Sequence, residues 1–121
     1  MKAVFDTNIL IDYCNGSSAA QKELEQYSTC IISVITWMEL LIGANNTKEE
    51  GALRSFLSGF LVIDIDLKVR ELAVEIKKKM RMRLPDAIIL ATARSLECIL
   101  VTRNTKDFSP DFVDIRVPYS Y

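Results

Sequence analysis

Short runs of consecutive apolar residues alternate with longer segments of helical periodicity, and this alternation constrains the fold of the chain more than any other feature. The strand candidates are residues 2–5, 30–33, 60–65, 98–102 and 113–117. Strands that are apolar on both faces are typical of a parallel sheet with helices on each side. The sequence therefore predicts an α/β fold, a three-layer α/β/α sandwich with a five-stranded, mostly parallel central sheet.

Helical segments fill the intervals between these strands. The candidates are residues 7–16, a segment from Ser17 or Ser18 to about 27, 34–43, a segment ending at 58, 67–83 and 85–96. Asp66 stands at the N-cap position of the fifth candidate. No linker or repeat divides the 121 residues, so we expect a single domain over residues 1–121.

The composition is that of a soluble globular protein, with 50% hydrophobic and 26% charged residues. No apolar window is long enough to span a membrane, and no export signal is visible. Cys14, Cys30 and Cys98 are widely spaced and lie in or beside apolar runs, which predicts reduced core thiols in a cytoplasmic protein. The chain contains no histidine, and this excludes histidine-based nucleophilic triads, histidine general acid–base chemistry and most zinc hydrolase sites.

Four carboxylates follow or face the predicted strand ends: Asp6, Glu39, Asp86 and Asp107. In open parallel sheets, ligands bind beyond the carboxyl ends of the strands, where the strand order reverses. Clustered carboxylates repel one another, and a shared divalent cation relieves that repulsion. Mg²⁺ suits such oxygen ligands and activates water for phosphodiester hydrolysis without histidine.

Each acid also has an ordinary structural role. Asp6 could cap a helix, Glu39 has capping-box spacing from Thr36, Asp86 follows a helix-starting proline, and Asp107 lies in a polar loop. Taken singly, these roles are the more common ones. Their combination at one predicted edge of the sheet favours a shared site.

Net charge is only −1, but residues 77–83 form a basic block made of Lys77, Lys78, Lys79, Arg81 and Arg83. A solvated helix face and a phosphate-contacting patch explain this block equally well. Both interpretations stay open on the residues alone.

Four stretches together resemble the PIN-domain ribonucleases, in particular the VapC-type toxins of type II toxin–antitoxin pairs: "FDTNILID", "SVITWMEL", "LPDAIILATA" and "LVTRNTKDF". The resemblance covers nearly the whole chain and implies a five-stranded parallel sheet. It also implies that Asp6, Glu39, Asp86 and Asp107 bind one or two Mg²⁺ or Mn²⁺ ions and cut RNA, with Thr7, Asn8, Thr102 and Asn104 supporting them.

The same resemblance implies partners. It suggests a homodimer, to which "WMELLIGA" and the following helix could contribute, and a small antitoxin whose tail occupies the active-site groove. By that analogy the basic block, with Arg103 and Lys106, would contact RNA phosphates or acidic groups of the antitoxin.

Three other functions are consistent with parts of the sequence. Asp64 and Asp66 are spaced as in haloacid-dehalogenase-type phosphatases, but Lys68 and the short remainder of the chain fit that class poorly. A non-catalytic module could use the acids to hold metal or a partner. A housekeeping PIN nuclease would process RNA without an antitoxin.

Overall fold

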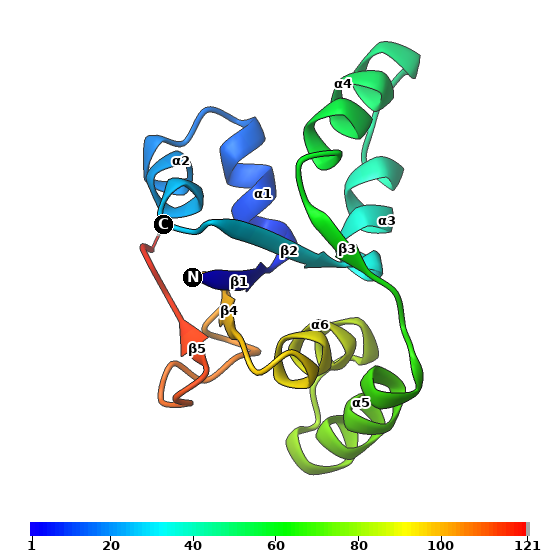
Figure 1. Cartoon of the computed structure of the whole chain (residues 1–121), viewed down its shortest axis with the longest axis vertical. Helices are drawn as coiled ribbons and strands as arrows, with labels where there is room; N and C mark the ends of the chain where they lie inside the picture. Colours follow the sequence, from blue (N-terminus) through cyan, green and yellow to red (C-terminus); the bar gives the residue numbers. More distant parts are fainter. Residues whose placement is uncertain (121) are drawn as a thin grey trace.

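The computed structural model describes residues 1–120, which form five strands and six helices (Figure 1). The strands are β1 (Lys2–Phe5), β2 (Thr29–Ser33), β3 (Leu61–Ile63), β4 (Ile99–Val101) and β5 (Ile115–Arg116). The helices are α1 (Thr7–Cys14), α2 (Ser18–Glu25), α3 (Val34–Ile42), α4 (Thr47–Leu57), α5 (Leu67–Met80) and α6 (Leu84–Ser95).

The strands form one sheet in the order β3-β2-β1-β4-β5, and every neighbouring pair is parallel. Helices α5 and α6 cover one face, while α1 to α4 lie on the other (Figure 1). The predicted fold class is therefore confirmed. The fifth strand, β5, lies at one edge of the sheet and β3 at the other.

Successive side chains of the central strands enter two separate hydrophobic cores. Val4 and Leu100 point into the core beneath α5 and α6, whereas Phe5 and Val101 point into the core beneath α1 to α4. This period of two is the normal consequence of the strand pleat. Both faces are buried, which explains why the strands read as continuous apolar runs.

Helix α6 is buried on most of its circumference because it lies between the sheet and α5. Its fully or nearly fully buried residues include Ala87, Ile89, Leu90, Ala91 and Ala93. Small and branched side chains at these positions let the helix approach the sheet closely. The carboxylate at its start, Asp86, is thus carried by a rigid element.

We expect Leu90→Ala to lower the free energy of unfolding by about 2–5 kcal/mol, because Leu90 is 0% exposed and its removal leaves a cavity. Urea denaturation measures this loss. Val74→Ala on α5 is the matched control, since Val74 is 51% exposed and should change stability by less than about 0.5 kcal/mol. Equal losses in the two variants would contradict this assignment of the core.

Some predicted element ends differ from those in the structure. Helix α5 ends at Met80 rather than at residue 83, because Arg81 adopts a left-handed backbone conformation with φ of 56° and caps the helix. The strand predicted over 60–65 is shorter, ending at Ile63. Asp66 does cap α5, and its Oδ1 accepts a hydrogen bond from the Val69 amide at 2.9 Å.

The prediction that all three cysteines are core thiols is wrong for Cys14, which is exposed at the end of α1. Cys30 is half-buried and Cys98 is buried. All three thiols are free within residues 1–120. Over the same residues, no helix has both the length and the apolar character needed to cross a membrane.

Candidate active site

The candidate site lies at the carboxyl ends of β1 and β4, where the strand order reverses. Asp6 directly follows β1, and Thr102 directly follows β4. The Asp6 amide donates to the Val101 carbonyl at 2.9 Å, which extends the ladder by one step and fixes the two segments side by side. Sheet pairing thus brings together residues far apart in the sequence.

Asp6 is the most constrained of the four acids and is only 4% exposed. Its Oδ1 accepts from the Thr7 amide at 2.8 Å, and its Oδ2 accepts from Thr102 Oγ1 at 2.7 Å and from Asn8 Nδ2 at 3.1 Å. Burial raises the pKa of Asp6 to about 6, although the bonds from Thr102 and Thr7 oppose this rise. The nearby charges of Asp86 and Glu39 raise that pKa further.

Glu39 reaches the site from α3, and its capping-box interpretation is wrong. The helix begins at Val34, and its cap is Ser33, whose Oγ accepts from the Ile35 amide at 3.0 Å. Glu39 Oε1 instead accepts from Thr7 Oγ1 at 2.7 Å. The hydroxyl oxygens of Thr7 and Thr36 lie 3.0 Å apart, so Thr36 supports the same contact.

Asp86 lies in the first turn of α6, where the helix dipole favours a carboxylate. It is 6% exposed, and its Oδ2 accepts from Arg83 Nε at 3.3 Å. Burial raises the pKa of Asp86, and the Arg83 guanidinium opposes this rise. The carboxylates of Asp107 and Glu39 raise it further, so Asp86 lies within electrostatic reach of both.

Asp107 is half-buried on the loop that follows β4. Its Oδ2 accepts from Asn104 Nδ2 at 2.9 Å, and its amide donates to Asn104 Oδ1 at 3.3 Å. The Asn104 amide in turn donates to Thr102 Oγ1 at 3.0 Å. A chain of hydrogen bonds therefore runs from Asp107 through Asn104 and Thr102 to Asp6.

The two buried acids each interact electrostatically with two others. Asp86 and Glu39 raise the pKa of Asp6, and Asp107 and Glu39 raise the pKa of Asp86. Among residues 1–120, no three of them converge into a preformed set of metal ligands. Each carboxylate is oriented by its own hydrogen-bond donor instead: Thr102, Thr7, Arg83 or Asn104. Carboxylate oxygens are nevertheless the ligands that Mg²⁺ and Mn²⁺ bind. A divalent ion would also offset the burial and mutual repulsion of these charges.

The basic block, residues 77–83, spans the end of α5 and the cap of α6, and all five of its Lys and Arg side chains are exposed. Lys79 pairs with Glu75 at 2.9 Å, and Arg83 pairs with Asp86. Beside it, a pocket of about 360 Å³ is lined by Met82, Lys106 and Asp107, among others. Lys106 is thus next to one of the four acids.

Arg103 pairs with an acid outside the four. Its Nε and Nη2 donate to the two carboxylate oxygens of Asp12 at 2.6 and 3.0 Å. Asp12 is not among the acids that the sequence indicated, yet it is only 5% exposed. Its spacing of three residues from buried Ile9 on α1 is the signal that could have indicated burial.

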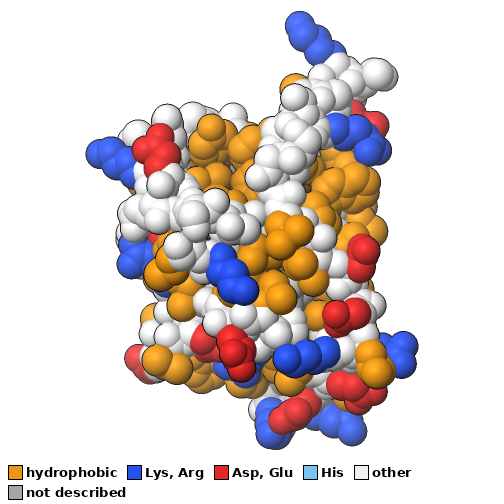
Figure 2. All heavy atoms as spheres, viewed as in Figure 1, with side chains coloured by type: hydrophobic (Ala, Val, Ile, Leu, Met, Phe, Trp, Pro, Cys, Tyr) orange, Lys and Arg blue, Asp and Glu red, His pale blue; other side chains and the backbone are white. Residues whose placement is uncertain are grey.

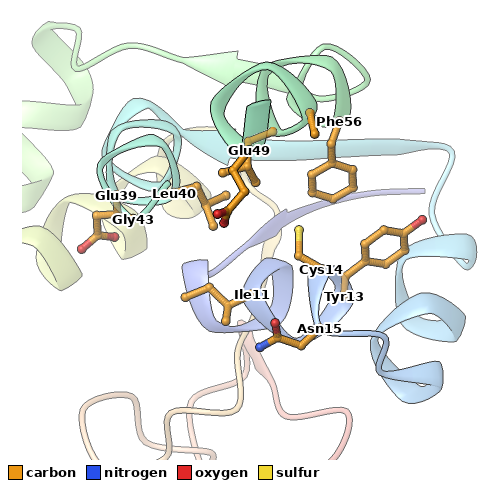
Figure 3. Close-up of a pocket in the computed structure, with 11 residues that line it drawn as sticks. Ile11, Tyr13, Cys14, Asn15, Glu39, Leu40, Gly43, Glu49 and Phe56 are labelled. Carbon is orange, nitrogen blue, oxygen red and sulfur yellow. The ribbon is translucent and has the colours of Figure 1, made fainter. Parts of the chain in front are cut away.

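A groove of about 560 Å³ opens between α1, α3 and α4 (Figure 3). Its lining is mostly apolar and includes Ile11, Leu40 and Phe56, with Tyr13 stacked on Phe56 at a ring separation of 4.9 Å. Figure 2 shows hydrophobic side chains on the surface between α1 and α4, whereas charged side chains gather around α5. Glu39 also lines this groove, which therefore adjoins the acidic site.

Comparison with known proteins agrees with this geometry. Residues 3–110 match the PIN domain family. The chain is 32% identical over 120 residues to the tRNA(fMet)-specific endonuclease VapC of Shigella flexneri, covering 89% of this chain and 90% of that protein. A chain in a toxin–antitoxin complex from Klebsiella pneumoniae superimposes with a TM-score of 0.91 and 42% identity, covering 98% of this chain and 99% of that one.

A DNA-bound VapBC structure from Salmonella typhimurium has a TM-score of 0.84 at 23% identity, with coverage of 98% of this chain and 99% of the other. At that identity the similarity supports the fold alone. The family match spans most of the chain, and the Shigella relative exceeds 30% identity over nearly all of it. The chain therefore belongs to the PIN-domain family and is one of its VapC-type members.

Proposed function

We propose that this protein is a divalent-metal-dependent endoribonuclease and the toxin of a toxin–antitoxin pair. The proposal is supported by the placement of two buried carboxylates, Asp6 and Asp86, within electrostatic reach of each other and of Glu39 near the switch point of the sheet. Asp107 lies within electrostatic reach of Asp86. RNA endonuclease activity is consistent with the name of the Shigella relative. The absence of histidine is no obstacle, because carboxylates and a metal ion suffice for phosphodiester hydrolysis.

The four acids would hold one or two Mg²⁺ or Mn²⁺ ions, which supply an activated water and neutralise charge on the phosphate. The residues around them hold the carboxylates in place. Thr102 and Asn8 direct Oδ2 of Asp6, and Thr7 directs Glu39. These hydrogen bonds stabilise the ionised form of the carboxylates, which is the form that binds a metal ion.

RNA would approach from the side of the basic block and Lys106. These side chains are exposed, and the pocket beside Asp107 gives an RNA strand room next to the acids. Lys and Arg in such positions contact phosphates without reading the base sequence. Arg103 has a different partner in Asp12, so its predicted contact with RNA or antitoxin is not part of this proposal.

An antitoxin segment would occupy the apolar groove between α1, α3 and α4. The groove passes from Ile11 and Phe56 to Glu39, so a segment seated there ends beside the acidic site. Burying an amphipathic helix in such a groove is a common recognition mode. The Klebsiella and Salmonella structures that this chain resembles are complexes of toxin with antitoxin or of VapBC.

We also propose a homodimer that uses the exposed apolar side chains of α3. Met38 is 40% exposed and Ile42 is 82% exposed, which leaves apolar surface uncovered in the single chain. The sedimentation coefficient of the antitoxin-free protein tests whether it is a dimer, as we expect, or a monomer.

RNA cleavage by the purified, antitoxin-free protein tests the proposed function. We expect cleavage with Mg²⁺ or Mn²⁺, loss of cleavage with EDTA, and recovery when metal is restored. Asp86→Asn, purified in parallel, controls for contaminating ribonucleases and should be inactive. Equal cleavage by wild type and Asp86→Asn would refute the assignment. Growth arrest that a neighbouring short reading frame relieves would distinguish a toxin from a housekeeping nuclease.

A further inference from the structure

A second polar cluster lies beside the acidic site and joins three distant parts of the chain. Asp12 on α1 accepts both bonds of the Arg103 guanidinium, at 2.6 and 3.0 Å, and a bond from the Tyr119 hydroxyl at 2.9 Å. Asp12 is only 5% exposed. A bidentate pair of this kind fixes both the distance and the plane of the two groups.

The position of Arg103 in the sequence makes this pair relevant to the site. Its neighbour Thr102 donates to Asp6, and its other neighbour Asn104 donates to Asp107. The Arg103 amide also donates to Asn8 Oδ1 at 3.4 Å, and Asn8 itself donates to Asp6. The loop that orients two of the four acids is therefore tied to α1 through Arg103.

We propose that Asp12 is a positioning residue of the nuclease. Through Arg103 it holds the loop 102–107 against α1, and this keeps the carboxylates of Asp6 and Asp107 in a fixed relation. Tyr119 connects the C-terminal segment to the same carboxylate. The inference rests on the proposed function, because its consequence is measured on RNA cleavage.

The loop needs such an anchor because it has little regular structure of its own. Between β4 and β5 the described backbone forms only turns and bends. Within this loop, Asn104 Nδ2 holds the Asp107 carboxylate by a hydrogen bond of 2.9 Å. A small rotation of the loop would therefore move Asp107 relative to Asp6, and metal sites tolerate such displacements poorly.

The chain contains a matched control of the same chemistry. Glu23 on α2 accepts two bonds from the Arg116 guanidinium, at 2.6 and 3.0 Å, and one from the Tyr27 hydroxyl at 2.8 Å. Glu23 is 2% exposed, so its burial matches that of Asp12. This second cluster fastens β5 to α2.

The experiment compares Asp12→Asn with Glu23→Gln in steady-state RNA cleavage with Mg²⁺. We expect Asp12→Asn to lower kcat by about 10- to 100-fold while KM for RNA changes by less than about twofold, and to require more Mg²⁺ for half-maximal activity. Glu23→Gln should change kcat by less than about twofold, since the Glu23 cluster does not contact the loop that orients Asp6 and Asp107. Melting temperatures of both variants control for loss of folded protein.

Hydrogen exchange gives a readout that does not depend on activity. The amides of Asn104 and Asp107 donate to side chains within the loop. Their exchange should become faster in Asp12→Asn and remain unchanged in Glu23→Gln. If Asp12→Asn does not fold, Tyr119→Phe replaces it. This substitution removes the hydrogen bond from Tyr119 to Asp12 and keeps the ion pair of Asp12 with Arg103, so kcat should fall by less than about 10-fold.

Unchanged kcat in Asp12→Asn would overturn the proposal. A higher KM at unchanged kcat in Arg103→Ala would also overturn it, because Arg103 would then be an RNA contact. If the wild-type protein cleaves no RNA, the proposed function fails instead, while unchanged exchange of the loop amides in Asp12→Asn would still reject the positioning role.

Discussion

Asp6→Asn is expected to abolish RNA cleavage and, in the same protein, to raise the stability of the metal-free form at neutral pH. The loss of cleavage follows because an amide is a poor replacement for a carboxylate ligand, and we expect a fall of at least about 100-fold. The gain in stability follows from burial. Asp6 is 4% exposed, and burial raises its pKa to about 6.

The sign of the stability effect comes from proton linkage. In the unfolded chain Asp6 ionises near its ordinary pKa of 3.8, whereas in the folded chain it ionises at about 6. Between these values the folded state binds more protons, so stability falls as pH rises from about 4 to 6. Above pH 6 the ionised carboxylate costs the metal-free protein up to about 3 kcal/mol, which asparagine avoids.

The observed gain should be smaller than this limit, on the order of 1 kcal/mol, because the asparagine amide has a single oxygen and cannot accept both from the Thr7 amide and from Thr102 and Asn8. Urea denaturation in EDTA at pH 5 and pH 7.5 measures it. The difference between variant and wild type should be larger at pH 7.5. Mg²⁺ should raise the melting temperature of the wild type more than that of the variant. A difference between variant and wild type that does not grow from pH 5 to pH 7.5 would contradict the linkage argument.

The fold could be predicted from the sequence because its strands are buried on both faces. Residues such as Val4 and Phe5 enter different cores, so neighbouring positions are all apolar and the parallel sheet is visible in the sequence. The positions of the acids followed from the same rule, since Asp6 comes directly after a strand. Element ends were less predictable, because the left-handed cap at Arg81 has no glycine or asparagine to indicate it.

The contacts that organise the site could not be predicted. The capping-box spacing of Thr36 and Glu39 is real, but Ser33 begins the helix one turn earlier, so the same residues face Thr7 instead. Asp12 and Arg103 are 91 residues apart, and only sheet pairing between β1 and β4 brings their segments together. Sequence separation of that size carries no local signal.

Thr102→Val is expected to lower cleavage by about 10- to 100-fold at pH 7 and limiting Mg²⁺, although valine has nearly the same shape. Thr102 is 0% exposed; its hydroxyl donates to Asp6 at 2.7 Å and accepts from the Asn104 amide at 3.0 Å. That donated bond lowers the pKa of Asp6 and opposes the effect of burial. Without it the pKa of Asp6 rises further.

The consequence is a pH dependence with a defined sign. A metal ion and a proton compete for the same carboxylate, so a higher pKa of Asp6 weakens metal binding most at low pH. The deficit of Thr102→Val should therefore shrink as pH rises from 6 to about 8.5 and as Mg²⁺ is increased. Thr92→Val is the matched control, because Thr92 is 1% exposed and its hydroxyl donates only to the Ile88 carbonyl within α6, at 2.8 Å. A deficit in Thr102→Val that is independent of both pH and Mg²⁺ would mean that the hydroxyl acts on the loop at Asn104 rather than on the ionisation of Asp6.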